Sequence, residues 1–420
     1  MQKMISFKRM CMNRCSQQIL NQLKRNISKS SLRPGRECIS SELIADRQAE
    51  TQSVKIGKKP NIRSISMAQP KPQPSFFSED ERQEYMATFP DIVKDLTEDI
   101  EYADMSEVNK RLTEMLQYIL PKNKRAYGLW TAVAYKMLEL PENLTPENIR
   151  LAHILSWCIH MLRCFFITMD DLMDNGDLRF GHPCWHKLEG VGSMAPNDAL
   201  LLKNCIYTLL CKHFGDKKCY RNILDMFHVT TTRMVMGQAL DMICKNPDGT
   251  PRLEDFTMNR VDTVVKYKSG RVHVYSALAL AMYFANRHDP EEHRHVENIC
   301  MELGNFYQKQ NDYLDCFGDQ DWIGKEGNDI QEGKCSWLAV AALERATPAQ
   351  RKIMQEHYGR ADKNSVQMVK DLYLELDLPS VFTAFEEQSF NRICSQIEQA
   401  KGLPHELFYR MVNTTYRTNF

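Results

Sequence analysis

Two short stretches of the sequence place acidic side chains at helical spacing. The stretch DDLMD contains Asp170, Asp171 and Asp174. The stretch NDYLD contains Asn311 and Asp315 at the corresponding positions. Residues four apart lie on one face of a helix, and like charges at that spacing repel each other, so both stretches predict a compensating cation. Flexible oxygen ligands suit Mg²⁺, which keeps several waters and bridges to phosphate groups.

A diphosphate is the natural ligand for Mg²⁺ held between two carboxylate clusters, and its remaining negative charge needs further cations. Taken singly, each nearby lysine would be read as a surface residue. As a set in loops or at helix ends close to both clusters, they predict a diphosphate site. An acidic helix end facing solvent would explain one cluster, but two clusters that each follow an apolar segment favour a metal site. The candidate cations are Arg179, Lys266, Lys268, Lys325 and Lys334.

The elements that must position these residues are predicted to be helices. From Phe76 onward, apolar residues recur at i, i+3, i+4 and i+7, as in LAHILSWCIHMLRCFFITM, and Pro and Gly fall mostly between such segments. Strand-like alternation and Asn-Gly hairpin turns are not evident. We therefore expect an all-α catalytic domain over residues 76–420.

The N-terminal segment has a different composition from the rest of the chain. Residues 1–36 contain many Lys, Arg and Ser residues and no Asp or Glu, and residues 46–75 read as a flexible linker that ends in a Pro-rich stretch. Residues 1–75 are therefore expected to be a targeting segment and linker. The composition is typical of a mitochondrial transit peptide, and a disordered basic tail on a cytoplasmic protein is the alternative.

Composition excludes several classes of function. The formal charge is zero, with 54 basic and 54 acidic residues, so nothing indicates a nucleic-acid partner. The 14 cysteines form no CxxC pair, which favours reduced thiols in a protein that is not secreted. We expect no apolar run of the roughly 18 residues needed to span a bilayer, and therefore a soluble protein without a transmembrane segment. The sequence contains no GxSxG, HExxH or P-loop motif.

Residues from about 76 to 420 resemble a farnesyl diphosphate synthase of the trans-isoprenyl diphosphate synthase family. The resemblance is carried by CFFITMDDLMD, GQALDM, KYKSG, GNFYQKQNDYLDCFGD and GKEGNDIQEGK, in that order. It implies an isoprenoid synthase type helical bundle around a central cavity, usually as a homodimer. It also implies about three Mg²⁺ ions, with Mn²⁺ as a substitute, that bridge both Asp-rich motifs to an allylic diphosphate.

The resemblance assigns roles to individual residues. Metal ligands would be Asp170, Asp174, Asn311 and Asp315. Catalysis would involve Asp170, Asp171, Asp174, Arg179 and Lys268. The diphosphate-binding residues would be Arg179, Gln238, Asp241, Lys268, Ser269, Gln308, Lys325 and Lys334.

The departures from the family pattern concern mainly the site for isopentenyl diphosphate. Its binding loop keeps Lys124 but has Tyr127 in place of an arginine, and Phe180 replaces the second arginine after the first Asp-rich motif. Arg163 stands where a glutamine or histidine is common, and Asn311 replaces an aspartate. Each lost charge-assisted contact is worth about 1.5–3 kcal/mol, so the loss of two arginines predicts weak binding, unless Arg163 or Arg125 compensates.

An enzyme that ionises an allylic diphosphate but holds no second substrate would cyclise or quench its own carbocation. We therefore expect a class I sesquiterpene synthase acting on farnesyl diphosphate, with Phe165 and Phe166 closing the cavity below the metal site. By analogy with insect enzymes, its product would be a pheromone or similar volatile signal. The alternatives are a prenyltransferase that uses isopentenyl diphosphate, and a non-catalytic partner subunit of an active synthase.

Overall fold

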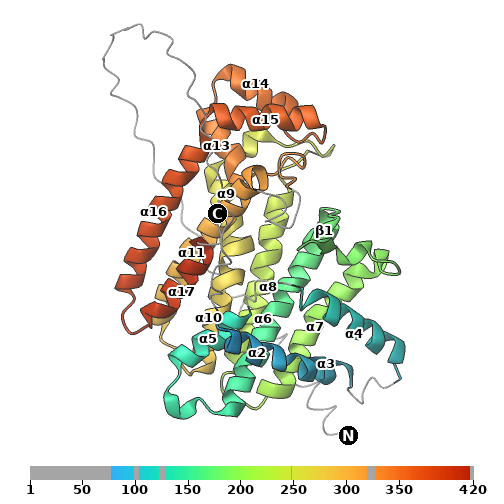
Figure 1. Ribbon diagram of the computed structural model, residues 1–420, viewed down its shortest axis with the longest axis vertical. Coiled ribbons are helices and arrows are strands. Elements are labelled where there is room, and N and C mark those ends of the chain that lie inside the picture. The colour runs from blue at the N-terminus through green and yellow to red at the C-terminus, as the bar shows by residue number, and fades with distance from the viewer. Residues whose placement is uncertain (1–76, 99–103, 123–127, 247, 319–326, 417–420) are drawn as a thin grey trace, which may run out of the picture. The chain divides into compact units, whose positions relative to one another are not determined.

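The computed structural model describes residues 77–98, 104–122, 128–246, 248–318 and 327–416 (Figure 1). Residues 1–75 lie outside this range, so the targeting segment and the mitochondrial location stay predictions. Lys124, Arg125, Tyr127 and Lys325 also lie outside the described residues.

Helices follow one another along almost all of the described chain, which confirms the predicted all-α class (Figure 1). They are α2 (Glu79–Ala87), α3 (Phe89–Thr97), α4 (Ser106–Ile119), α5 (Leu129–Leu138), α6 (Pro146–Met173), α7 (Ala195–Phe214), α8 (Tyr220–Met242), α9 (Met258–Val264), α10 (Ser276–Phe284), α11 (Pro290–Phe317), α13 (Trp337–Arg345), α14 (Pro348–His357), α15 (Lys363–Glu375), α16 (Leu378–Gln399) and α17 (His405–Tyr416). A π-helical segment, Val265–Tyr275, connects α9 to α10.

The two helices that carry the acidic clusters begin at side-chain caps. The Thr145 hydroxyl accepts a hydrogen bond from the Asn148 amide at 3.2 Å, and Pro146 occupies the first turn of α6. The Asp289 carboxylate accepts a hydrogen bond from the Glu291 amide at the start of α11. These caps fix where each helix starts, and each acidic cluster follows in its last turns.

Helix α6 is more apolar than the sequence analysis expected. Its length and a window with mean hydropathy 1.4 would allow it to cross a membrane, which corrects the expectation that no run is long enough. However, 94% of that window is buried inside the protein, as in the core helix of a folded domain. The neighbours of α6, rather than lipid, therefore account for its apolar surface.

Two hydrophobic cores hold the helices together. The larger core contains buried side chains of α5, α6, α7 and α10. The second contains those of α13, α15 and α16. Helix α11 contributes Leu303 to the first core and Phe306 to the second, so it links the two.

Glycines let the π-helical segment lie unusually close to both of its neighbouring helices. A Cβ atom on Gly304 of α11 would lie 2.3 Å from the Cα of Gly270, and one on Gly237 of α8 would lie 2.5 Å from the Lys268 amide nitrogen. Side chains cannot be accommodated at such distances, so these positions require glycine. This close packing brings Lys268 between α8 and α11.

A small β-hairpin follows α6 and interrupts the helical pattern of the described chain. Strands β1 (Leu178–Arg179) and β2 (His182–Pro183) pair antiparallel. The two turn residues, Phe180 and Gly181, have φ values of +55° and +76°. Two-residue hairpin turns of this kind favour Asn-Gly, and a bulky residue at positive φ is strained. The sequence analysis missed this hairpin because Phe-Gly is not a usual turn signal.

Candidate active site

The two acidic clusters face a common cavity of about 250 Å³. Its walls come from α6, α8, α9, the π-helical segment, α11 and the loop before α13. Polar side chains and apolar ones both contribute to the lining, so charged chemistry and a hydrocarbon chain fit the same space. The polar lining includes Asp170, Arg179, Gln238, Asp241, Lys268, Gln308, Asn311, Asp312, Asp329 and Lys334.

Asp170 is held by groups from three other segments. Its Oδ1 accepts a hydrogen bond from Gln238 Nε2 at 3.3 Å and lies 3.3 Å from Lys268 Nζ. Its Oδ2 lies 3.5 Å from Arg179 Nη2. Although burial alone would raise the pKa of Asp170, the charges of Lys268, Lys334 and Arg179 hold that pKa well below its usual range. Asp170 is therefore ionised at neutral pH, as a metal ligand must be.

Lys268 joins two carboxylates from different helices. Its ammonium donates to Asp241 Oδ2 at 2.7 Å while it contacts Asp170. Burial works against the charge of Lys268, but Asp241 and Asp170 raise its pKa. Ser269 follows Lys268 in the π-helical segment. The predicted cation at position 268 is thus adjacent to the first acidic cluster.

Arg179 lies beside the same cluster because the hairpin turns the chain back after α6. Its Nε donates to Asp171 Oδ1 at 2.7 Å, and its Nη2 also contacts this oxygen. Burial raises the pKa of Asp171 in spite of this pairing. Asp171 thus orients Arg179, while Asp170 points into the cavity. Phe180, next in the turn, also lines the cavity.

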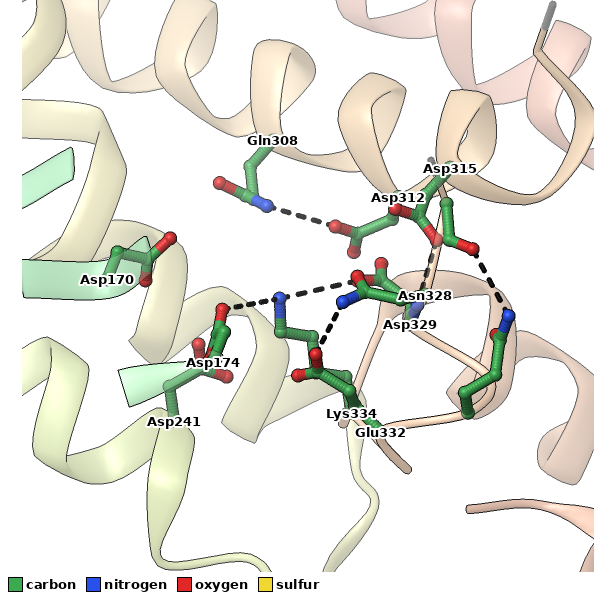
Figure 2. Close-up of polar contacts among 12 residues, drawn as sticks. Asp170, Asp174, Asp241, Gln308, Asp312, Asp315, Asn328, Asp329, Glu332 and Lys334 are labelled. Carbon is green, nitrogen blue, oxygen red and sulfur yellow. Dashed lines mark hydrogen bonds and ion pairs between the residues drawn. The ribbon is translucent and has the colours of Figure 1, made fainter. Parts of the chain in front are cut away.

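Lys334 lies between the first cluster and the loop that follows α11. Figure 2 shows its ammonium between Asp174 and Asp329, at 3.7 Å and 3.4 Å from their carboxylate oxygens. Burial disfavours the charge, but Asp329 and Asp174, with other nearby carboxylates, hold the pKa of Lys334 well above its usual range. The ion pairs cross the cavity, from the end of α6 to the loop before α13.

The residues of the second cluster differ in their surroundings: some line the cavity, and others accept hydrogen bonds from neighbouring segments. Asn311 lines the cavity, whereas Asp315 Oδ1 accepts a hydrogen bond from the Asp329 amide at 2.9 Å. Asp312, which the sequence analysis left out, is buried and accepts a hydrogen bond from Gln308 Nε2 at 3.0 Å (Figure 2). The Trp337 amide also donates to Asp312, at 2.8 Å. Burial raises the pKa of Asp312.

The sequence analysis did not identify two further residues that line the cavity, Asp312 and Asp329. Asp312 repeats the position of Asp171 in the first motif, which is a signal that the sequence contained. Asp329 follows Asn328 in GNDIQEGK, but no spacing rule connects it with Lys334 before the loop is folded.

The α6 part of the cavity lining combines apolar side chains with an arginine. Phe166 is among the lining residues, whereas Phe165 packs in the core with its ring centroid 4.8 Å from that of Phe166. Arg163, one turn before Phe166, is 7% exposed and lines the cavity. A guanidinium is therefore present on the wall that also holds the first acidic cluster.

The donor set suits Mg²⁺. Within the described ranges, no three Asp, Glu, His or Cys side chains converge closely enough to form a metal cage by themselves. Mg²⁺ is usually held by one or two carboxylates, with waters and substrate phosphates completing its coordination. Asp170 on α6 and Asn311 on α11 line the cavity and supply oxygen donors of this kind, and Asp174 lies 3.7 Å from the cavity-lining Lys334.

Comparisons with known proteins agree with this arrangement. Residues 109–376 match the family described as polyprenyl synthetase. The farnesyl pyrophosphate synthase of Murgantia histrionica is 41% identical over 82% of this chain and 84% of the relative, and that of Nezara viridula is 40% identical over the same shares. The T. brucei farnesyl diphosphate synthase complexed with risedronate has 26% sequence identity and a TM-score of 0.75, over 81% of this chain and all of that one.

These findings correct the expected activity. A sesquiterpene synthase was wrong as the main interpretation, because relatives that cover most of the chain at about 40% identity are farnesyl pyrophosphate synthases. Three further expectations depended on that interpretation and have no support: the lyase reaction, the sesquiterpene product and the pheromone role. The sequence analysis gave more weight to the two lost arginines than to compensation by Arg163, a residue that lines the cavity. Enzymes of this family use Mg²⁺, and this chain belongs to the polyprenyl synthetase family as a farnesyl diphosphate synthase-like enzyme.

Proposed function

We propose that the chain is a prenyltransferase that condenses an allylic diphosphate, such as geranyl diphosphate, with isopentenyl diphosphate to form farnesyl diphosphate. The allylic C–O bond breaks, a C–C bond forms to the terminal alkene carbon of isopentenyl diphosphate, and one proton and diphosphate are released. The observation that carries this proposal is the set of three cations, Arg179, Lys268 and Lys334, placed beside the first acidic cluster at one cavity.

The residues around the cavity have different roles in ionisation of the substrate. Asp170, Asp174 and Asn311 are the proposed holders of Mg²⁺, which, when bound, neutralises the diphosphate and stabilises its departure. Asp315, the fourth expected ligand, is instead engaged by the Asp329 amide and does not line the cavity. Lys268 and Lys334 have raised pKa values, because nearby carboxylates outweigh their burial, so they remain charged donors for the leaving oxygens.

The apolar wall protects the carbocation that ionisation produces. Phe166, Met234 and Val265 line the cavity together with these charged groups. Aromatic and aliphatic side chains exclude water, and an aromatic face favours a nearby cation. The chain therefore offers a dry space for the allylic tail and the new C–C bond.

Arg163 is the proposed cation for the second diphosphate. Phe180 offers no charge at the cavity wall, but Arg163 lines the same cavity and is almost fully buried. A guanidinium binds diphosphate oxygens in a bidentate manner, and removal from water strengthens that interaction. Arg163 thus supplies charge that Phe180 and Tyr127 lack.

A direct assay tests the reaction. The full-length protein, given geranyl and isopentenyl diphosphates with Mg²⁺, is expected to form farnesyl diphosphate, detected by mass spectrometry of the products. Farnesyl diphosphate alone is expected to remain unconverted. If the mixture gives no condensation product, the proposed function is wrong.

Asp170→Asn should abolish most of this turnover, because the substitution removes the charge that binds Mg²⁺ at the first cluster. Several kcal/mol of transition-state stabilisation correspond to about a thousandfold lower kcat. Asp177→Asn is the matched control, since Asp177 pairs with Lys187 at the surface and is 84% exposed. Equal activity of the two variants would show that Asp170 holds no essential metal.

Arg163→Gln should raise the KM for isopentenyl diphosphate by about tenfold to a hundredfold, the loss expected for one charge-assisted contact. The KM for the allylic diphosphate should stay within about twofold. Phe180→Arg is the complementary variant and should lower the KM for isopentenyl diphosphate. Steady-state kinetics with one substrate varied at a time distinguish these effects. An unchanged isopentenyl KM in Arg163→Gln contradicts the assigned role.

We further propose that the protein forms a homodimer through the exposed face of α8. Val229 and Met236 on this helix, and Ile243 at its C-cap, recur every seventh residue and are 45%, 61% and 58% exposed. Val235 and Met242 form a second row beside them, at 52% and 45% exposure. An apolar stripe of this kind is typical of an interface. In a two-fold symmetric dimer, the stripe of one copy packs against the same stripe of the other.

Met236→Glu should convert the dimer into a monomer, because it would place like charges in the middle of the interface. Multi-angle light scattering measures the mass in solution. Leu374→Glu is the control, since Leu374 is 56% exposed on a different helix, α15. A monomeric wild-type protein, or a Met236→Glu variant that stays dimeric, would contradict this interface.

A further inference from the structure

The side chain of Lys334 depends on how its loop is held. The ammonium reaches Asp174 and Asp329 from a flexible four-carbon stem, so small movements of the backbone change both contacts. One anchor of the loop comes from α11, where Asp315 Oδ1 accepts a hydrogen bond from the Asp329 amide. Asp329 lies five residues before Lys334. Its hydrogen bond therefore does not fix the end of the loop that carries Lys334.

The second anchor comes from Tyr358, directly after α14. Its hydroxyl donates to the carbonyl oxygen of Lys334 at 2.6 Å. That oxygen also accepts a hydrogen bond from the Ser336 amide at 2.8 Å. Tyr358 is 3% exposed, and its ring packs edge-on against Phe256 with the centroids 5.9 Å apart. Packing of the buried ring therefore fixes the position of the hydroxyl.

The residue after Tyr358 also holds the loop. The Gly359 amide donates to the Ile330 carbonyl at 2.9 Å. Gly359 has a φ of +81°, and a Cβ atom there would lie 2.6 Å from Pro251 Cδ. Gly333, in the loop itself, has a φ of +65° and packs against the same proline. The turn at 358–359 and Pro251 thus leave little room for the loop to shift.

We propose that Tyr358 is a positioning residue: it orients the Lys334 backbone so that the ammonium points across the cavity at a bound diphosphate. Tyr358 itself is absent from the cavity lining, and the shorter contact of its hydroxyl is to the Lys334 carbonyl, at 2.6 Å against 3.4 Å to the Asp329 carbonyl. The proposal rests on the proposed function, since it assigns Lys334 to the allylic diphosphate. It gives α14, which is remote from the chemistry, a role in substrate affinity.

Tyr358→Phe is the sharpest variant, because it removes the hydroxyl donor and keeps the ring against Phe256. The Ser336 amide still satisfies the Lys334 carbonyl, so the loop should remain folded. Tyr85→Phe is the matched control, since Tyr85 is a buried tyrosine of α2 in the other hydrophobic core. The Tyr85 hydroxyl is buried without a hydrogen-bond partner among the described residues, so thermal unfolding of the two variants separates the loss of the Tyr358 hydrogen bond from the removal of a buried hydroxyl.

The test measures binding of inorganic pyrophosphate to the full-length protein by titration calorimetry, with Mg²⁺ and again with a chelator. Tyr358→Phe should raise the Mg²⁺-dependent Kd by about fivefold to thirtyfold, and Tyr85→Phe should leave it unchanged. In a Lys334→Ala background, Tyr358→Phe should have no further effect, because the group that it orients is gone. The KM for the allylic diphosphate should rise in Tyr358→Phe while that for isopentenyl diphosphate does not.

Three outcomes overturn the proposal. They are an unchanged Kd in Tyr358→Phe, an equal loss in the Lys334→Ala background, and no Mg²⁺-dependent binding by the wild-type protein. The first two would mean that the hydroxyl is only a structural contact. If the wild-type protein binds pyrophosphate, depends on Tyr358 and yet makes no farnesyl diphosphate, the proposed function fails while the positioning role stands.

Discussion

Half-buried carboxylates and their cationic partners determine the arrangement of this protein. Asp170, Asp174 and Asp241 lie around one cavity, where isolated charges would be costly. Arg179, Lys268 and Lys334 neutralise them, yet these cations come from a hairpin, a π-helical segment and a loop that are far apart in the sequence. The fold must bring all of these segments to the end of α6, and most of its other features serve that requirement.

The surrounding elements meet that requirement by close packing. Gly237 and Gly304 let the π-helical segment approach α8 and α11, which places Lys268 between Asp170 and Asp241. The Phe180–Gly181 turn returns the chain so that Arg179 meets Asp171. Strain at Phe180 and tight glycine contacts are local costs that ion pairing and burial offset.

The same ion pairs explain why metal and diphosphate belong together in this site. A cation that entered alone would have to displace lysine ammonium groups from their carboxylates. A diphosphate alone would meet carboxylates that repel it. When both bind, each charge again has a partner, so coupled binding follows from the charge balance of the cavity.

The sequence by itself determined the helical class and the first acidic cluster, because helical periodicity and i, i+4 spacing are local properties. It also identified Arg179, Lys268 and Lys334 as cations for a diphosphate, since lysines near two Asp-rich motifs form a recognisable set. The family resemblance rested on those same residues. Local reasoning therefore reached the half of the site that is proposed to hold the metal and the allylic diphosphate.

Only the tertiary structure decided which charges meet. Arg163 and Phe180 are 17 positions apart, and that both line one cavity follows from the return of the chain after α6. From the sequence alone, the loss of an arginine at position 180 therefore predicted the loss of a substrate. The partnership of Lys334 with Asp329 and the role of Tyr358 also depend on how a loop packs against a distant turn. Such contacts have no period in the sequence, so spacing cannot reveal them.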